Sequence, residues 1–402
     1  MVFGCCNPSI FTQVICNLGT FSPLWRWCAV RSLTPLPDKQ TVACELLELV
    51  AISGELPTDQ LTRLYGGESY KLNVVKSLKS KKLLRTFYRD GLRGYRLTAK
   101  AKDSLLADNP RRFTFALTGT AETNRIKSEI TRRLRLHRIA EATMTMMNAD
   151  VLINRDEKPD LFSPQWEESK RITIKAPAFY NSREIKEIGT VFVKIRGARS
   201  VGVLLTPAEI FLVYNLGDSL MRWEYKSEMR TKALMKTVVC RERLPSQYPP
   251  DAVQGLLLGN GMELAYNLLA GEGGKQYFIL DGNYEHFYYL TNDRKGERLL
   301  MLLCSEALRD RLETVLMTDL YDGDKGSTLE NDAFDTDGNP VLFGYLCDLP
   351  RIKRFDTALR LQKKSGTLIC FDFQKEVLSR YCGMQVQFQT IDFEKWERSF
   401  FE

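Results

Sequence analysis

Histidine is scarce in this sequence of 402 residues, and no two cysteines form a C-x-x-C pair. The two histidines, His137 and His286, are well separated in the chain, whereas a paired-histidine relaxase site needs two that lie close together. A structural zinc site would need the missing cysteine pairs. Neither histidine lies near a nucleophile-elbow sequence, so a Ser-His-Asp triad has no support. We expect His137 to be a hydrogen-bonded residue at the boundary of the core.

Nucleotide-binding and membrane-spanning sequences are also lacking. No G-x-x-x-x-G-K-[ST] loop occurs, and no G-x-G-x-x-G follows an expected strand. No run of about 18 uncharged apolar residues is present, so we expect no membrane-spanning helix.

The ten cysteines show no spacing typical of a disulfide scaffold, and several lie in apolar runs. Reduced, buried thiols and a cytoplasmic location are therefore expected.

The apolar content, 44%, is that of a globular protein, and the length suggests two or three domains. Residues 1–37 are apolar and predict a poorly ordered leader, with an anchor to a membrane surface as the alternative. The rest mixes helical and strand patterns, which predicts an α/β protein, α+β overall. We expect a first domain at 38–109, a connecting helix at 110–150 and an α/β domain at 151–402.

The segment 38–109 combines helices with one hairpin. "DKQTVACELLELVAISG" predicts a first helix, and "LPTDQLTRLYGG" a short second one with Thr58 as its N-cap. The segments on either side of the Asp90-Gly91 turn have the side-chain alternation of strands, which predicts a hairpin. The segment "AKAKDSLLAD" predicts a closing helix. This order predicts a winged helix-turn-helix domain. The stripe that we expect the third helix to bury is Leu72, Val75, Leu78 and Leu83.

Positive charge is concentrated in this segment. Eleven cations between Lys71 and Lys102 face one acid, Asp90, a net +10 where the whole chain carries +7. Such a concentration is typical of phosphate contact, and in a winged helix the third helix enters the major groove while the wing contacts the backbone or minor groove. We therefore expect double-stranded DNA as the partner. The candidate DNA-binding residues are Tyr70, Asn73, Lys76, Ser77, Lys79, Lys81, Lys82, Arg85, Arg89, Arg93 and Arg96.

The alternative is a protein-docking module without DNA binding, because winged helices also dock onto proteins and surface cations are often merely solvated. Tyr70 and Asn73 favour DNA, since a purely solvated face rarely carries an aromatic side chain.

The following segment, 120–151, predicts a long, basic connecting helix. Its cations either extend the phosphate track or are solvated on a dimer helix.

From residue 151 on, strand-like runs such as "TVFVKI", "SVGVLLT", "EIFLVYN", "QYFIL" and "TLICFDF" alternate with helical runs such as "GERLLMLLCSEALRDRLETVLM". This predicts an α/β domain with a mixed sheet, because hairpins such as Val201 to Asn215 occur beside helical crossovers. We expect this half to bind mobile-element proteins or to form a homo-oligomer, without a cofactor and without enzymatic activity.

A metal-dependent nuclease is the enzymatic alternative. Pro159-Asp160 and, on an expected strand, Glu224-x-Lys226 have the order of a PD-(D/E)xK-like site, with two carboxylates for Mg²⁺ and a lysine to orient the attacking water. Glu141 would be a third carboxylate. About 64 residues separate Asp160 from Glu224, and we expect the two to lie too far apart to share a metal.

The order of "ELLELVAISGELPTDQLTRLYG", "VKSLKSKKLLRTF", "GYRLTAKAKDSLL" and "RRLRLHRIAE" resembles the replication-relaxation family of Gram-positive plasmids and conjugative elements. The likeness covers roughly residues 38–160. It implies a winged helix followed by a restriction-endonuclease-like domain. It also implies a DNA-binding role in the replication or mobilisation of a mobile element, or in the regulation of these steps.

Overall fold

The computed structural model describes residues 33–164, 172–188, 198–271, 277, 280, 284–322 and 329–401. Residues Thr34–Glu402 form one compact unit. It mixes helices with three sheets, two of which contain both parallel and antiparallel strands, so the predicted α/β class is confirmed. The expected leader up to residue 32, the expected strand at 190–195 and most of the one at 276–280 lie outside the described residues.

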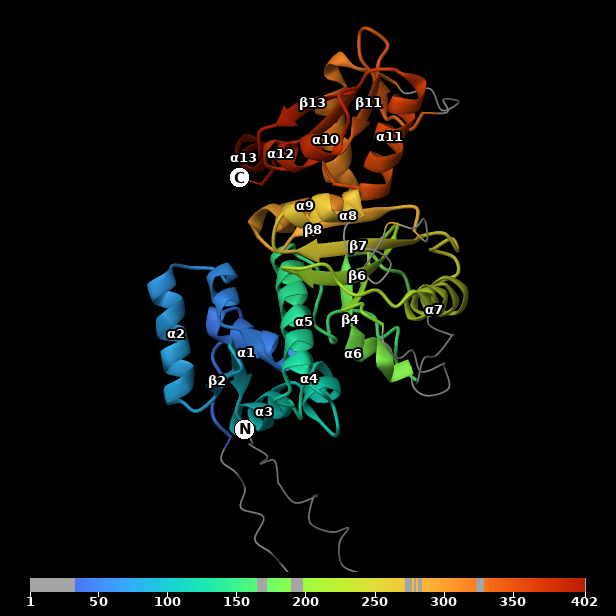
Figure 1. Ribbon diagram of the computed structural model, residues 1–402. Helices are drawn as coiled ribbons and strands as arrows, with labels where there is room; N and C mark the ends of the chain where they lie inside the picture. Colours follow the sequence, from blue (N-terminus) through green and yellow to red (C-terminus); the bar gives the residue numbers. More distant parts are fainter. Residues whose placement is uncertain are drawn as a thin grey trace, which may run out of the picture. The chain divides into compact units, whose positions relative to one another are not determined.

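The first seven elements contain the predicted helices and hairpin (Figure 1). Strand β3 lies between β1 and β2 and is antiparallel to both. The elements are α1 (Val42–Ser53), β1 (Leu56–Pro57), η1 (Asp59–Arg63), α2 (Glu68–Ser80), β2 (Leu84–Arg89), β3 (Leu92–Leu97) and α3 (Ala99–Asp108).

Two local expectations in this part are wrong. The second helix is only a 3₁₀ turn, η1, and the side chain of Thr58 does not cap it. In α2 the buried stripe contains Val74 in place of Leu72, which is 45% exposed. The stripe begins at Lys71, whose ammonium donates to the carbonyls of Thr62 at 2.7 Å and Leu64 at 3.0 Å. The lysine thus buries its stem and satisfies carbonyls of the preceding turn.

The predicted connecting helix is two helices, α4 (Pro110–Leu117) and α5 (Ile130–Asn148). The side chain of Asn109 accepts a hydrogen bond from the backbone N–H of Arg112 at 3.0 Å, and Pro110 occupies the first turn of α4, so a helix begins there. Helix α5 packs against α1 and β1 on one side and against β6 and α9 on another. It is therefore shared between the N-terminal part and the following sheet.

The first five-stranded sheet has the order β4-β5-β6-β7-β8. Strands β4, β5 and β6 are antiparallel, which confirms the expected hairpin, and β6, β7 and β8 are parallel. Helices α7 and α8 make the two parallel crossovers. The elements are β4 (Ala178–Asn181), α6 (Ser182–Ile185), η2 (Lys186–Ile188), β5 (Gly202–Leu205), β6 (Ile210–Gly217), α7 (Tyr225–Met235), the π-helix η3 (Lys236–Arg243), β7 (Val253–Gly259), α8 (Glu263–Ala270) and β8 (Phe287–Thr291).

The remaining strands form a second five-stranded sheet, of order β13-β12-β11-β10-β9, where one mixed sheet was expected. The expected long helix at 296–317 is two helices, because Ser305 ends α9 and its hydroxyl caps α10. Two further helices, α12 and α13, were not predicted. The elements are α9 (Arg294–Cys304), α10 (Glu306–Leu316), η5 (Met317–Asp319), β9 (Tyr321–Asp322), β10 (Ala333–Phe334), β11 (Pro340–Phe343), α11 (Leu349–Gln362), β12 (Gly366–Phe371), α12 (Asp372–Tyr381), β13 (Val386–Ile391) and α13 (Phe393–Phe401).

None of the helices in the described ranges is both long and apolar enough to cross a bilayer. The six described cysteines are free, and four of them, Cys44, Cys240, Cys347 and Cys370, are buried. Their reduced and largely buried state agrees with the sequence-based expectation.

A buried carboxylate joins α5 to the hairpin. Glu55, fully buried, accepts hydrogen bonds from Arg96 of β3 at 2.8 Å and from Arg133 of α5 at 2.5 Å. His137, one turn further along α5, places Nε2 3.0 Å from the same carboxylate, as expected for a hydrogen-bonded boundary histidine. A Cβ at Gly94 would lie 2.4 Å from Oε1 of Glu55, so glycine is required opposite this group.

Replacing Glu55 with Gln should destabilise the protein strongly. It would leave Arg96 and Arg133 buried without a counter-charge, which costs about 3–5 kcal/mol of the free energy of unfolding. Urea unfolding followed by circular dichroism measures this. Glu129→Gln, which removes an exposed partner of Arg132, is the control and should change stability by less than about 1 kcal/mol. Equal effects of the two changes would contradict this role of Glu55.

Candidate nucleic-acid interface

Helix α2 presents a polar, cationic side to solvent. Its buried positions, from Lys71 to Leu78, lie on one side, so the intervening residues face outward. Tyr70 is 50% exposed, and Tyr65, just before the helix, is 88% exposed. All the candidate residues on α2 or directly after it are exposed, namely Tyr70, Asn73, Lys76, Ser77, Lys79, Lys81 and Lys82.

The hairpin β2–β3 has the tight turn that its sequence predicts. Arg89 pairs with Leu92, so only Asp90 and Gly91 form the loop, and their φ angles are 52° and 77°. Positive φ angles at both loop residues define a type I′ turn, whose twist matches that of the two flanking strands. The side chains of Arg85, Arg89 and Arg93 are exposed on this hairpin.

Arg96 is the one candidate DNA-binding residue that the structure contradicts. It is 3% exposed, and its guanidinium faces Glu55 in the interior. It also lies over the ring of Phe87, with 3.7 Å between the guanidinium carbon and the ring centroid. Alternation alone does not explain this burial, because Arg85, which pairs with Arg96 across the hairpin and so lies on the same face, is exposed, as is Arg93.

Helix α5 holds the hairpin turn in place. Arg133, which is fully buried, donates to the carbonyl of Arg89 at 2.8 Å and to that of Leu92 at 3.1 Å, in addition to its contacts with Glu55. These carbonyls flank the two-residue loop. Arg133 therefore belongs neither to a phosphate track nor to a solvated dimer face, the two roles expected for the cations of this helix.

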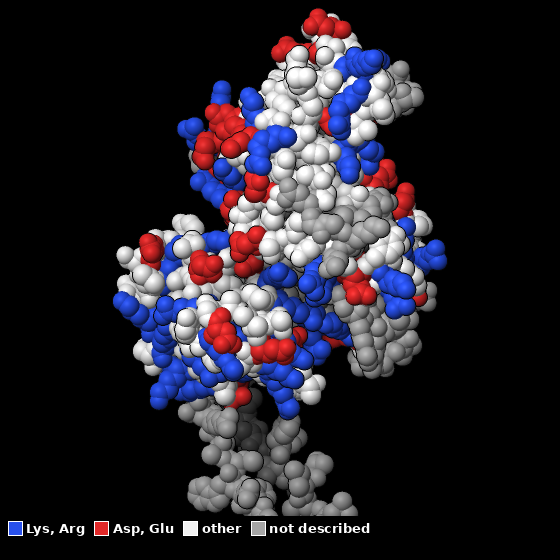
Figure 2. Space-filling model, viewed as in Figure 1, with Lys and Arg blue, Asp and Glu red and all other residues white. Residues whose placement is uncertain are grey.

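Three of the eleven cations between residues 71 and 102 face inward, since Lys71 and Arg96 are buried and Lys102 donates to the carbonyl of Asn124 at 2.6 Å. Eight remain exposed, with Asp90 as the one acid of that stretch. Figure 2 shows Lys and Arg side chains along the side of the molecule where Figure 1 draws α2 and β2. The exposed cations are Lys76, Lys79, Lys81, Lys82, Arg85, Arg89, Arg93 and Lys100.

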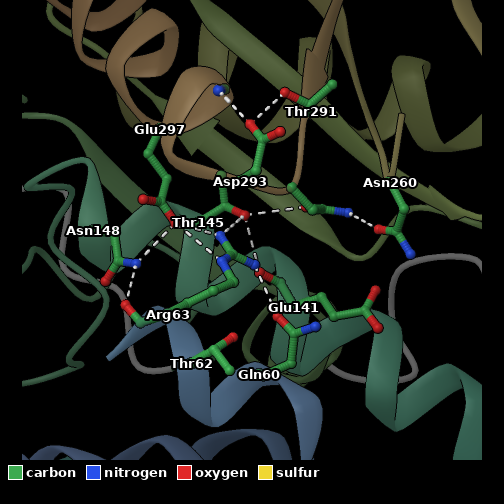
Figure 3. A network of polar contacts seen from close by, with 12 residues as sticks. Gln60, Thr62, Arg63, Glu141, Thr145, Asn148, Asn260, Thr291, Asp293 and Glu297 are labelled. Carbon is green, nitrogen blue, oxygen red and sulfur yellow. Dashed lines mark hydrogen bonds and ion pairs between the residues drawn. The ribbon is translucent and has the colours of Figure 1, made fainter. Parts of the chain in front are cut away.

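A polar network anchors η1 to the first five-stranded sheet (Figure 3). Arg63 donates to Glu297 of α9 at 2.6 Å and to the hydroxyl of Thr145 in α5 at 2.7 Å. Asn148 donates to Glu297 at 2.8 Å and to the carbonyl of Arg63 at 3.2 Å. The turn that precedes α2 is thus fixed to both α5 and α9.

Sequence reasoning missed a cluster of asparagines at the carboxyl ends of the parallel strands. Asn292, after β8, donates to Asn215 of β6 at 3.0 Å and to Asn260, after β7, at 3.1 Å. Asn215 in turn donates to Glu141 of α5 at 2.9 Å. Burial raises the pKa of Glu141, and the hydrogen bond from Asn215 opposes this. A signal was present, because "FLVYN", "LLLGN" and "YYLTN" each end an apolar strand with Asn.

A cleft lies between the hairpin turn and this edge of the sheet. Its volume is about 470 Å³. The hairpin contributes Gly91 and Arg93, α5 contributes Arg138, and the end of β6 contributes Asp218. The hairpin and the α/β half thus share one concave surface.

The residues of the nuclease alternative have the following surroundings. Asp160 forms an ion pair with Arg155 at 3.0 Å. Glu224 is the N-cap of α7 and Lys226 lies in its first turn, so the expected strand is a helix here. The described residues contain no group of three or more metal-ligating side chains, and Glu141 is bound to Asn215.

Compared with protein-family models, curated proteins and solved structures, the chain matches none of them.

The pH dependence of stability should report the Glu55 cluster. Burial acts to raise the pKa of Glu55, but hydrogen bonds from His137, Arg133 and Arg96 outweigh it and lower the pKa to about 2. A carboxylate with a lowered pKa stabilises the fold above its unfolded pKa of about 4.3, and this contribution disappears as the pH falls toward 2.

We therefore expect the free energy of unfolding to fall between about pH 5 and pH 2 by about 3 kcal/mol more in the parent protein than in Glu55→Gln. Urea titrations at stepped pH measure both curves. Parallel curves for the two proteins would contradict a charged Glu55 in the folded state.

Proposed function

We propose that the protein binds double-stranded DNA through its N-terminal part, with η1 and α2 as a helix-turn-helix, α2 in the major groove and the hairpin β2–β3 as the wing. The eight exposed cations on and around α2 and the wing carry this proposal. Neutralising phosphates with such side chains is the main source of affinity for DNA. The order of the elements, helix, strand, helical turn, helix, hairpin, supports a winged-helix interpretation.

The two parts of this surface have different tasks. Arg89 and Arg93 on the wing contact the backbone or the minor groove and fix the position of the protein on the duplex. Tyr70, Asn73 and Ser77 lie about one turn apart along the outer side of α2, where they reach base edges. The polar contacts of Arg63 and Arg133 hold turn, helix and wing in fixed positions.

The biological setting rests on the resemblance to the replication-relaxation family. We propose a role at a plasmid or conjugative element, in replication, mobilisation or the control of either. In this proposal the protein is cytoplasmic, and the α/β half binds element proteins or a second copy of the chain. No observation favours the nuclease, because Asp160 pairs with Arg155 and Glu224 begins a helix where a strand was expected.

The salt dependence of DNA binding tests the electrostatic part of the proposal. The logarithm of the association constant should fall linearly with the logarithm of the salt concentration, by about 0.9 for each phosphate contacted. Fluorescence anisotropy with a labelled duplex at four or more salt concentrations measures the slope. A slope near zero would reject DNA binding and favour the protein-docking alternative.

Substitutions separate positioning from sequence recognition. A preferred site is first selected from random duplexes. Arg89→Ala and Arg93→Ala should then weaken binding to all sequences alike. Asn73→Ala should cost about 1–3 kcal/mol at the preferred site and much less on random DNA. Lys395→Ala, an exposed cation of α13, is the control. Equal losses on both kinds of DNA for Asn73→Ala would show that α2 does not read the sequence.

A further inference from the structure

A second group of cations lies outside the winged-helix unit. Arg135 and Arg138 come from α5, Arg183 from α6, Lys186 from η2, and Arg199 precedes β5. We call these five residues the α5 patch. Figure 2 shows a group of Lys and Arg side chains where Figure 1 draws α5 and α6. Arg183, Lys186 and Arg199 lie in the α/β half, outside both the predicted connecting helix and the proposed winged helix, so neither gives them a role.

Few of these cations form ion pairs with neighbouring acids. Within the described ranges, only Arg135 of the patch has a carboxylate within ion-pair distance, Glu122 at 3.9 Å. One acid in the surroundings, Glu228, accepts a hydrogen bond from the backbone N–H of Arg199 at 2.7 Å, and two others are engaged elsewhere. Glu187 pairs with Arg155 at 2.7 Å, and Glu141 accepts a hydrogen bond from Asn215 at 2.9 Å. The patch therefore carries excess positive charge.

The cations also act on one another. Crowding by protein atoms and the charges of Arg135 and Arg183 lower the pKa of Lys186 to about 8, although Glu122 opposes this. Burial lowers the pKa of Arg138 and the charge of Arg199 adds to the effect, whereas the charges of Glu141 and Asp218 oppose it. Like charges held together in this way cost folding free energy, which a bound polyanion would offset.

The patch is continuous with the proposed wing. Arg93 of the wing and Arg138 of the patch both line the cleft of about 470 Å³. From Arg138 the patch extends along α5 to Arg135 and then to α6. A chain of phosphates that leaves the wing at Arg93 thus meets Arg138 across this cleft, whose lining also includes the acids Asp59, Glu141 and Asp218.

We propose that the α5 patch is a second contact for the duplex that binds α2 and the wing, so that the DNA continues from the wing across α5 onto the α/β half. This inference rests on the proposed function. A duplex is favoured as the occupant because the patch offers cations, which suit a phosphate backbone, and joins a surface already assigned to duplex DNA.

The proposed second contact lengthens the footprint. A duplex that also reaches Arg183, Lys186 and Arg199 of the α/β half must extend beyond the part that covers α2 and the wing. A duplex of about 12 base pairs, roughly one turn, is long enough for α2 and the wing, whereas about 24 base pairs are needed to reach the patch as well.

The test uses the full chain and both duplexes. The triple variant Arg183→Gln, Lys186→Gln and Arg199→Gln removes the contribution of the α/β half. On the duplex of about 24 base pairs its salt slope should be shallower than that of the parent by up to about 2.7, or about 0.9 for each phosphate that the variant no longer neutralises. On the duplex of about 12 base pairs its slope should equal that of the parent.

The control variant removes three exposed lysines from the second five-stranded sheet and its helices, Lys353→Gln, Lys364→Gln and Lys395→Gln, and so makes the same change in net charge. Neither variant should lower the parent's urea midpoint. Parental slopes for the patch variant on both duplexes, or the same loss on both, would overturn the second contact while leaving the winged-helix site intact. Failure of the parent itself to bind either duplex would reject the proposed function.

Discussion

The buried charge of Glu55 is the constraint on which the N-terminal part depends. A carboxylate without solvent is tolerated only with strong donors around it, and here Arg96, Arg133 and His137 supply them. These donors come from a strand and from a helix that is distant in sequence. One ionised group thus fixes the hairpin, the preceding strand and α5 relative to one another.

The same contact determines which cations remain outside. Arg96 and Arg133 are buried and paired with Glu55, while Arg93 and Arg85 stay exposed on the hairpin. Because Arg133 also holds the carbonyls beside the turn, the exposed arginines are displayed on a rigid support. Net charge alone cannot distinguish these two groups, since an arginine counts equally whether it faces solvent or a buried carboxylate.

Much of the fold could be predicted from local patterns. Helical spacing and the Asp-Gly turn located α1, α2, the hairpin and α3, because these signals act within a few residues. The two separate sheets escaped prediction, since they depend on tertiary packing, whereas the helix cap at Ser305 is a local signal that was overlooked. In the candidate site, the exposed side of α2 followed from periodicity. The inward turn of Arg96 did not, because its partner Glu55 lies 41 residues away.

Helix α5 belongs to two structures at once, and this has a consequence for dividing the protein. A fragment that ends before α5 would keep Glu55 and Arg96 but lack Arg133 and His137, and it would uncover the apolar side of α1 that α5 now covers. A fragment that begins at α5 would carry Arg133 without its carboxylate. The chain therefore has no position between α1 and α5 at which it can be cut into two self-sufficient pieces.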